Sequence, residues 1–547
     1  MSYFEVEFDG VKHKYPQGTL FYEVSKASKK ENIMAYKIGN EVFSLDEKVN
    51  KNVKIEFINT DDIIGNKIYK AGLKFLFEVA LLECFPNLEV TYEHSVPRGM
   101  LAHVSGDKVL TQDDISVIKG KMSEIIYNND KIIKLNILPK EAINYFYHHS
   151  LYEKAENIQN ISDRVVNFYS LRKRLNYFYS LMPYNTGALN KFEIVYLGKN
   201  KLIFLFPTVK SHGKVPEYVH YASILESFWE GKKWLNQMHI PYVSDLNKLV
   251  GNGKIKDFIT SSELKFNLNI SKVVKDVQAR KDIKFILIAG PSSSGKTTTT
   301  SRIANYFAAE GYDTIKISLD DYFLDREKSP KDENGKYNFE CLEALDVSLF
   351  NQDLNDLLMG KEVLLPKYNF LTGKGEKGKE KISLKENSIV LIEGLHAINE
   401  ELTKSIASTY KYKVYLSPFI PLSIDRHNYI STLDMRLLRR MVRDNRTRGY
   451  EVTATIDSWQ SVRSGEEKYI FPYIHEADTI VNTALPYEIG VLKVYVLPLL
   501  LSVDVNSIYY EEARRLVDFL KQFFPIPGEY VNDESILREF IGGKYND

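Results

Sequence analysis

Hydrophobic residues follow different periods along this chain, and the strongest pattern lies near its middle. Residues 284–289 are almost all apolar, which is typical of a strand buried on both faces of a parallel sheet. Residues 297–310 carry apolar side chains at helical spacing, and Gly311 ends that run. The stretch 314–319 predicts the next strand, and the apolar run 388–392 predicts another buried strand. This alternation of strands and helices predicts an α/β fold with a doubly wound parallel sheet in the C-terminal part.

The front of the chain shows a pattern typical of short strands. Polar and apolar residues alternate from Tyr3 to Tyr15 around the tight-turn pair Asp9-Gly10, which predicts a β-hairpin. Thr19 is expected to cap a short helix, and strands are expected near 34–38 and 53–57. The sequence therefore predicts a small ββαββ module here.

Composition limits the classes of function. The 547 residues are too many for one core and suggest roughly three or four units. Lysine plus arginine equals aspartate plus glutamate at 72 each, so no overall charge draws the protein to nucleic acid or to an anionic membrane. Two cysteines, Cys84 and Cys341, exclude a disulfide framework. The sequence shows no basic-then-apolar leader and no long apolar run, so we expect a cytoplasmic protein without a membrane span.

Residues 290–297, Gly-Pro-Ser-Ser-Ser-Gly-Lys-Thr, match the phosphate-binding loop G-x-x-x-x-G-K-[ST] at every fixed position. The flanking strand and helix fall where this motif needs them. Lys296 is expected to hold the β- and γ-phosphates of ATP, and the Thr297 hydroxyl is expected to bind Mg²⁺. The predicted ATP contacts in this stretch are Gly290, Ser292, Ser293, Ser294, Gly295, Lys296, Thr297 and Thr298.

Acidic residues follow two of the predicted strands, at the edge where doubly wound sheets bind ligands. Asp320 and Asp321 follow the run 314–319, and a carboxylate there can deprotonate an acceptor hydroxyl. Glu393 follows the run 388–392 and is placed to hold Mg²⁺ directly or through water. No Asn-Lys-x-Asp motif follows the phosphate loop, which argues against a regulatory GTPase.

A basic amphipathic segment, 433–448, supplies a third element. Four of its arginines share one helix face, with apolar residues on the opposite arc. Such a helix is usually a solvated face, and sometimes it binds a membrane surface or a partner. Because Arg446, Arg448 and Gly449 follow closely, we predict instead a mobile lid that brings guanidinium groups onto the transferring phosphoryl group. The four arginines are Arg436, Arg439, Arg440 and Arg443.

Together these residues resemble the uridine kinase and phosphoribulokinase family over about residues 283–543. The resemblance implies that Asp320 is the base for a nucleoside 5′-hydroxyl, with Lys296 as a further catalytic residue, and that Thr297 and Glu393 bind magnesium. It also implies that three arginines grip phosphates, one of them as a catalytic and substrate-binding residue. The stretches that carry the resemblance are the phosphate loop, 319–323, 368–370, 392–396 and 439–444. The three arginines are Arg440, Arg448 and, as the catalytic and substrate-binding one, Arg443.

The same resemblance implies an acceptor site. Tyr368 and Phe370 match the aromatic pair that sandwiches the nucleobase in uridine kinases, and Glu343 falls near the acid that binds the ribose hydroxyls. Uridine-cytidine kinases place a histidine three residues after the second aromatic residue, where this chain has Gly373. We therefore expect an ATP- and Mg²⁺-dependent kinase that forms a nucleoside 5′-monophosphate, with the base left open.

Two alternatives remain open. The enzyme could phosphorylate another sugar-like alcohol, as phosphoribulokinase does. From another class, the protein could be a nucleotide-sensing or RNA-associated binding module, although its neutral net charge weakens that reading, because RNA affinity rests largely on phosphate contacts. The preferred phosphate donor also stays open, and so does the oligomeric state, for which a homo-oligomer is one possibility.

The N-terminal half resembles parts of threonyl-tRNA synthetase. Residues 1–60 look like its β-grasp module, known as TGS. Residues 61–207 are similar to its editing domain, through Ile137–Ala142 and Pro183–Gly187. That editing site uses a His-x-x-x-His pair on an early helix, whereas residues 67–74 contain no histidine. We therefore expect a retained scaffold without catalytic zinc or deacylation, which could still bind a nucleotide or amino acid that tunes the kinase.

The expected organisation is thus four units. Between the synthetase-like half and the phosphate loop, residues 208–281 are helical in pattern and are expected to form a connector. Residues 282–547 are expected to form the kinase domain.

Overall fold

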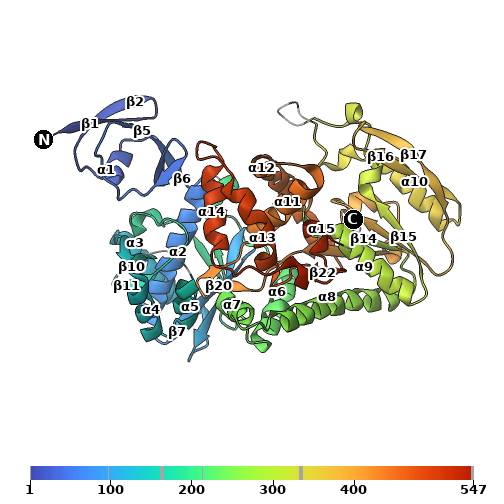
Figure 1. The fold of residues 1–547 in the computed structure, drawn as a ribbon, viewed down its shortest axis with the longest axis horizontal. Coiled ribbons are helices and arrows are strands. Elements are labelled where there is room, and N and C mark those ends of the chain that lie inside the picture. The colour runs from blue at the N-terminus through green and yellow to red at the C-terminus, as the bar shows by residue number, and fades with distance from the viewer. Residues whose placement is uncertain are drawn as a thin grey trace.

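The computed structural model describes residues 2–96, 98–160, 166–211, 213–331, 335 and 337–543. The N-terminal and C-terminal halves lie side by side along the long axis of the molecule, with the first sixty residues at one end (Figure 1). Within the described ranges, no helix is both long enough and apolar enough to cross a membrane.

A five-stranded parallel sheet forms the centre of the C-terminal half. Its strands lie in the order β15-β18-β14-β19-β22. The central strand β14 precedes the phosphate loop, and all of its residues are buried, as its apolar run predicts. An α/β fold with a parallel sheet is therefore confirmed. The strands are β14 (Phe285–Ala289), β15 (Asp313–Ser318), β18 (Ser388–Glu393), β19 (Lys411–Ser417) and β22 (Thr479–Asn482).

Helices cover both faces of this sheet, because residues of each strand point alternately to either side. Ile286 and Ile288 belong to the same buried cluster as side chains of α8 and α9. Phe285 and Leu287 point the other way, into a cluster with side chains of α10. These helices are α8 (Ile255–Gln278), α9 (Lys296–Ala309) and α10 (Val347–Leu358).

Three helices, the first of which begins at Ala222, make up most of the described part of the stretch 208–281, as its pattern predicts. Side chains of α7 and α8 belong to the buried cluster of the central sheet. On α6, Ile224 and Phe228 share a cluster with Leu101 and Ile203 of the N-terminal half. This stretch therefore packs as part of the C-terminal core and joins it to the N-terminal half. Its first two helices are α6 (Ala222–Gln237) and α7 (Val243–Gly251).

The N-terminal hairpin forms where the alternating pattern predicts it. Strands β1 and β2 pair antiparallel, with Asp9 and Gly10 at φ 51° and 77° in the turn, and β5 pairs parallel with β1. The prediction for Thr19 was wrong: Leu20 is the N-cap of α1, because the Thr19 hydroxyl is engaged with the Pro16 carbonyl at 2.8 Å. The elements are β1 (Tyr3–Phe8), β2 (Val11–Pro16), α1 (Phe21–Ser25), β3 (Ile33–Ile38), β4 (Glu41–Phe43), β5 (Val53–Lys54) and β6 (Glu56–Asn59).

The rest of the N-terminal half packs around the long helix α2 (Ile63–Cys84), most of whose residues are buried. Two sheets flank it, in the orders β12-β13-β8-β7 and β11-β10-β9. The further elements are β7 (Leu88–Val96), β8 (Gly99–Gly106), α3 (Gln112–Tyr127), β9 (Ile133–Ile137), α4 (Pro139–His148), α5 (Tyr152–Asn160), β10 (Val166–Leu171), β11 (Arg174–Asn176), β12 (Glu193–Gly198) and β13 (Lys201–Leu205).

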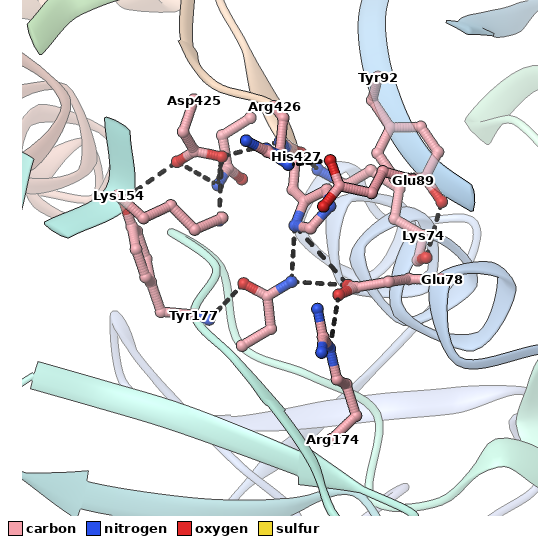
Figure 2. A network of polar contacts seen from close by, with 12 residues as sticks. Lys74, Glu78, Glu89, Tyr92, Lys154, Arg174, Tyr177, Asp425, Arg426 and His427 are labelled. Atoms are coloured by element: carbon pink, nitrogen blue, oxygen red, sulfur yellow. Dashed lines mark hydrogen bonds and ion pairs between the residues drawn. The ribbon is translucent and has the colours of Figure 1, made fainter. Parts of the chain in front are cut away.

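A short hairpin of the C-terminal half, β20 (Ser423–Asp425) and β21 (Asn428–Tyr429), lies among N-terminal elements (Figure 2). Asp425 forms an ion pair of 3.0 Å with Lys154 of α5, and both side chains are fully buried. The Lys74 ammonium on α2 donates to the His427 carbonyl at 2.7 Å. Buried polar contacts therefore hold the two halves together at this hairpin.

The hairpin leads directly into α11, which begins one residue after Ser431. A second, longer hairpin of β16 and β17 projects beside the central sheet (Figure 1). The remaining elements are β16 (Val363–Asn369), β17 (Lys374–Ile382), α11 (Thr432–Arg448), α12 (Val452–Tyr469), α13 (Glu488–Leu501), α14 (Tyr510–Leu520) and α15 (Arg538–Ile541).

Candidate active site

The phosphate loop connects β14 to α9 by a tight backbone path. Ser293 and Gly295 have φ of 58° and 82°, and Gly295 is the N-cap of α9. Gly290 has no room for a side chain, since a Cβ there would lie 2.7 Å from the Leu416 carbonyl oxygen. The Lys296 ammonium lies back over the loop and donates to the Gly290 carbonyl at 2.9 Å. The loop therefore has the curled form that turns backbone N–H groups toward an anion.

Unpaired hydroxyls support this reading of the loop. The Ser293 and Ser294 side chains are buried, and their hydroxyl oxygens have no hydrogen-bond partner among the described residues. Buried polar groups normally find a partner, so these hydroxyls fit a polar ligand such as a nucleotide polyphosphate. The Ser292 N–H is already engaged, because it donates to a Glu466 carboxylate oxygen at 2.9 Å.

Two carboxylates reach the same edge of the sheet as the loop. Glu393 ends β18, and its carboxylate accepts a hydrogen bond of 3.0 Å from the Thr297 hydroxyl. Asp320 lies two residues beyond Ser318, which pairs with Glu393 across the sheet. Asp320 is accessible to solvent, yet protein surrounds its carboxyl, and desolvation raises its pKa against the opposing charge of Lys296. Desolvation likewise raises the pKa of Glu393, again opposed by Lys296.

The oxygen ligands at this edge suit magnesium. The Thr297 hydroxyl and the Glu393 carboxylate are already in contact, and both are ligand types that Mg²⁺ takes. In the part of the chain that the structure describes, no group of three or more His, Cys, Asp or Glu side chains could hold a metal ion. The pair of Thr297 and Glu393 fits Mg²⁺, which is commonly held by one or two protein ligands together with substrate phosphates and water.

Two of the predicted lid arginines are buried and donate hydrogen bonds to backbone carbonyls of the phosphate loop. Arg436 is 1% exposed, pairs with Glu466 and donates to the Ser292 carbonyl at 2.9 Å. Arg439 is fully buried, pairs with Glu488 at 2.5 Å and donates to the Ser293 carbonyl at 3.3 Å. Their carboxylate partners lie on α12 and at the start of α13. These two arginines therefore differ from the lid expected for this helix, because their charges are satisfied in the core.

The other predicted arginines gather on one buried acid, Asp444. Arg440, Arg443 and Arg448 contact its carboxylate at 3.2, 2.9 and 3.3 Å. Arg440 also reaches the loop, donating to the Ser292 hydroxyl at 3.0 Å. Three cations on one carboxylate leave a net positive charge, which suits an anionic ligand. The role of Asp444 was missed, although its place beside Arg443 in the basic run was a signal.

The aromatic pair does not frame a gap. The rings of Tyr368 and Phe370 lie 5.1 Å apart at 77°, in an edge-to-face contact, with Tyr368 buried and Phe370 60% exposed. The expected sandwich is therefore not formed in this structure, because the two rings pack against each other. Asp321 positions this segment, accepting from the Tyr368 N–H at 3.3 Å and pairing with Lys367 at 3.0 Å. This role for Asp321 was also missed.

Where the expected histidine is absent, an arginine fills the space. Gly373 has φ 69°, and a Cβ there would lie 2.8 Å from Nε of Arg326. The Arg326 guanidinium also donates to the Phe370 carbonyl at 2.9 Å. The missing side chain at Gly373 thus makes room for Arg326 beside the aromatic pair.

Glu340, rather than Glu343, faces the charged residues of this edge. Glu343 is exposed, and its charge acts on the neighbouring Cys341. Glu340 is half-buried, and desolvation raises its pKa, with an opposing contribution from Lys296. Its backbone carbonyl contacts Nε2 of His396 at 3.0 Å. The assignment of Glu343 to the ribose hydroxyls stays a prediction, and spacing alone does not tell which of these two acids, three residues apart, turns inward.

Comparison with known proteins covers this part of the chain. Residues 285–488 match the family model described as "Phosphoribulokinase / Uridine kinase family". A uridine kinase of Macrococcus caseolyticus is 29% identical over 195 residues, which are 36% of this chain and 85% of that protein. A uridine kinase of Staphylococcus aureus is 28% identical over 202 residues, 37% of this chain and 88% of its own.

Among solved structures, one titled as a possible uridine kinase from Bacillus stearothermophilus aligns with 40% of this chain and all of its own, at 21% identity and a TM-score of 0.27. The family-model match falls on the strands, phosphate loop and arginine helix described above. Residues 285–488 therefore form a kinase domain of the phosphoribulokinase and uridine kinase family.

Proposed function

We propose that this protein is an ATP- and Mg²⁺-dependent kinase that phosphorylates the 5′-hydroxyl of a nucleoside. The observation that carries the proposal is the convergence of Lys296, the Thr297–Glu393 contact and Asp320 at one edge of the sheet. The similarity to uridine kinases supports a nucleoside as the acceptor. We propose the domain limits 1–60, 61–207, 208–281 and 282–547 for the whole chain.

On the donor side, ATP bound with Mg²⁺ supplies the phosphoryl group and partial neutralisation of its charge. Residues 293–298 bind the phosphates through N–H groups and hydroxyls, and Lys296 leaves the Gly290 carbonyl to contact them. The Thr297 hydroxyl and Glu393 carboxylate would hold the metal ion. Arg440, Arg443 and Arg448 bind phosphate oxygens; Asp444 fixes their direction.

On the acceptor side, Asp320 accepts the proton of the 5′-hydroxyl. Its raised pKa makes it a stronger base than an ordinary aspartate. Glu340 binds the ribose hydroxyls in place of Glu343, since it lies near Asp320 and Lys296. The base stacks on the exposed face of Phe370.

Arg326 gives this site a base preference. A guanidinium only donates hydrogen bonds, so it favours a base edge with a carbonyl oxygen over one with an amino group. Since Arg326 lies beside Phe370 and Gly373, we expect uridine to be a better acceptor than cytidine.

The test is a panel of acceptors assayed for ADP release with ATP and Mg²⁺. The panel contains uridine, cytidine, inosine, guanosine, adenosine and ribulose 5-phosphate. Uridine-dependent turnover supports the proposal, whereas turnover with ribulose 5-phosphate alone makes the enzyme a sugar kinase. Lys296→Ala should abolish turnover in a folded protein, because this lysine acts on phosphate charge. Lys272→Ala, an exposed change on α8, is the matched control.

A further inference from the structure

The end of the chain returns to the phosphate loop. Residues 528–543, which we name the C-terminal strap, lie beyond the stretch that matches the family model. The strap starts at a 3-10 turn and ends in α15, which lies beside α11 (Figure 1). Its Ile536 and Phe540 are buried in the same cluster as the central sheet. The strap is therefore a packed part of the C-terminal core.

The strap contacts both the loop and the arginine helix. A Cβ at Gly295 would lie 2.3 Å from Cδ1 of Ile536, so the loop backbone meets the strap at close range. From α11, Arg446 donates to the backbone carbonyls of Glu539 and Phe540, each at 3.3 Å. These contacts fix the position of the strap over the start of α9.

One carboxylate of the strap reaches into the first turn of α9. The Thr298 hydroxyl donates to Oε2 of Glu539 at 2.8 Å, and Thr298 is only 3% exposed. Thr298 is the third residue of α9, where backbone N–H groups lack helical partners and the helix dipole favours a negative charge. Thr298 also follows Lys296 and Thr297 directly, at the end of the phosphate-binding stretch. The Glu539 carboxylate thus lies where an anion is favoured next to that stretch.

We propose that Glu539 is an internal anion of the donor site, and that ATP binds by displacing its carboxylate from Thr298. The inference rests on the proposed function, because it assigns the phosphate loop to ATP. Donor phosphates that follow the first turn of α9 bring negative charge to a place that Glu539 already holds. Like charges at one site disfavour each other, so the strap carboxylate weakens donor binding and sets the ATP concentration at which the enzyme works.

The test measures ATP–Mg²⁺ binding by calorimetry to the full chain, for the wild type and Glu539→Gln. Glutamine keeps the length of the side chain and its acceptor oxygen but removes the charge. We expect about ten-fold tighter ATP binding in the variant, a size typical of one partly exposed charge. The Kd of uridine should stay unchanged, which separates a donor-site effect from a general change in folding. Glu534→Gln, an exposed acid of the same strap, should leave both affinities unchanged.

The outcomes separate the two proposals. Wild-type ATP binding with equal or weaker binding by Glu539→Gln would overturn the displacement model and leave the kinase assignment standing. Absence of ATP binding in both proteins would overturn the kinase assignment and this inference with it. Glu539→Asp gives a second reading, since the shorter side chain withdraws the carboxylate from Thr298 and should also tighten ATP binding. Thermal unfolding of each variant checks that its fold is kept.

Discussion

Replacing Lys74 with methionine should remove a pH dependence from the folding stability of the protein. Lys74 lies on α2 and is 7% exposed, and its ammonium donates to the His427 carbonyl at 2.7 Å (Figure 2). The ring centres of Tyr92 and Phe178 lie 5.6 and 5.2 Å from it. Burial among these groups lowers the pKa of Lys74 from 10.5 to about 7.

The sign of the effect follows from where the proton is held. Between pH 7 and about 10, Lys74 keeps its proton in the unfolded chain and releases it in the folded chain. Raising the pH therefore favours the folded state throughout this window, and below pH 7 the charged lysine is buried at a cost. One pH unit across such a window is worth about 1.4 kcal/mol, so the step from pH 7 to 9 adds at most about 2–3 kcal/mol to the unfolding free energy.

Urea unfolding at pH 7, 8 and 9 measures this step for the wild type and for Lys74→Met. Other groups titrate in the same range, so the quantity that matters is the difference between the two proteins. The gain with pH should be larger in the wild type by about 2 kcal/mol. Lys140→Met removes an exposed lysine and should keep the wild-type slope. Parallel pH profiles for wild type and Lys74→Met would show that Lys74 stays charged in the folded protein and would refute the reasoning.

Three further predictions concern the proposed site and the N-terminal half. Asp320→Asn should lower kcat by about 10²–10⁴-fold with ATP affinity kept, because the amide accepts no proton. Glu393→Gln should instead raise the Mg²⁺ concentration needed for half-maximal rate. Steady-state kinetics that show the reverse pattern would mean that the two acids have exchanged roles. Arg439→Met should lower the unfolding free energy by about 3–5 kcal/mol, since it leaves the buried carboxylate of Glu488 unpaired. Arg440→Met should mainly raise the KM for ATP. A stable but inactive Arg439 variant would contradict this division. Residues 1–207 should bind no catalytic zinc and deacylate no mischarged tRNA, which elemental analysis of the full chain and a deacylation assay check.

The phosphate loop could be predicted because its signals are local. The apolar run of β14, the glycines of the loop and the whole of α9 lie within 26 consecutive residues, from 284 to 309. The positions of the carboxylates that follow β15 and β18 could also be predicted, because parallel strands bring their carboxyl ends to one edge of the sheet. Whether those side chains carry out catalysis stays a prediction.

The arginine helix shows where such reasoning ends. A helical wheel places Arg436, Arg439 and Arg440 on one face, but each guanidinium contacts a different partner in the structure. Glu466 and Glu488 lie 30 and 49 residues further along the chain, on other helices. No local pattern predicts which arginine pairs with a buried carboxylate of another helix and which, like Arg440, pairs with Asp444 of its own helix and reaches the Ser292 hydroxyl. The same limit applies to Glu340 and Glu343, because the sequence does not tell which of the two turns toward Lys296.

The short hairpin of β20 and β21 could not be predicted for a related reason: its partners lie far away in the sequence. Its contacts also make the N-terminal half part of what stabilises the C-terminal half. Lys154 is 271 positions before its partner Asp425, and Asn157 donates to the Ile424 carbonyl at 2.7 Å across a similar separation. Without the N-terminal half, Asp425 would lose its buried counter-charge, and breaking such a pair costs about 3–5 kcal/mol when the acid stays buried. The hairpin also runs straight into α11, whose arginines hold the Ser292 and Ser293 carbonyls. A change in this hairpin would therefore reach the phosphate loop through one continuous segment. Loss of activity in a kinase half without residues 1–207 would thus report first on the fold of α11, and only then on any ligand bound by the N-terminal half.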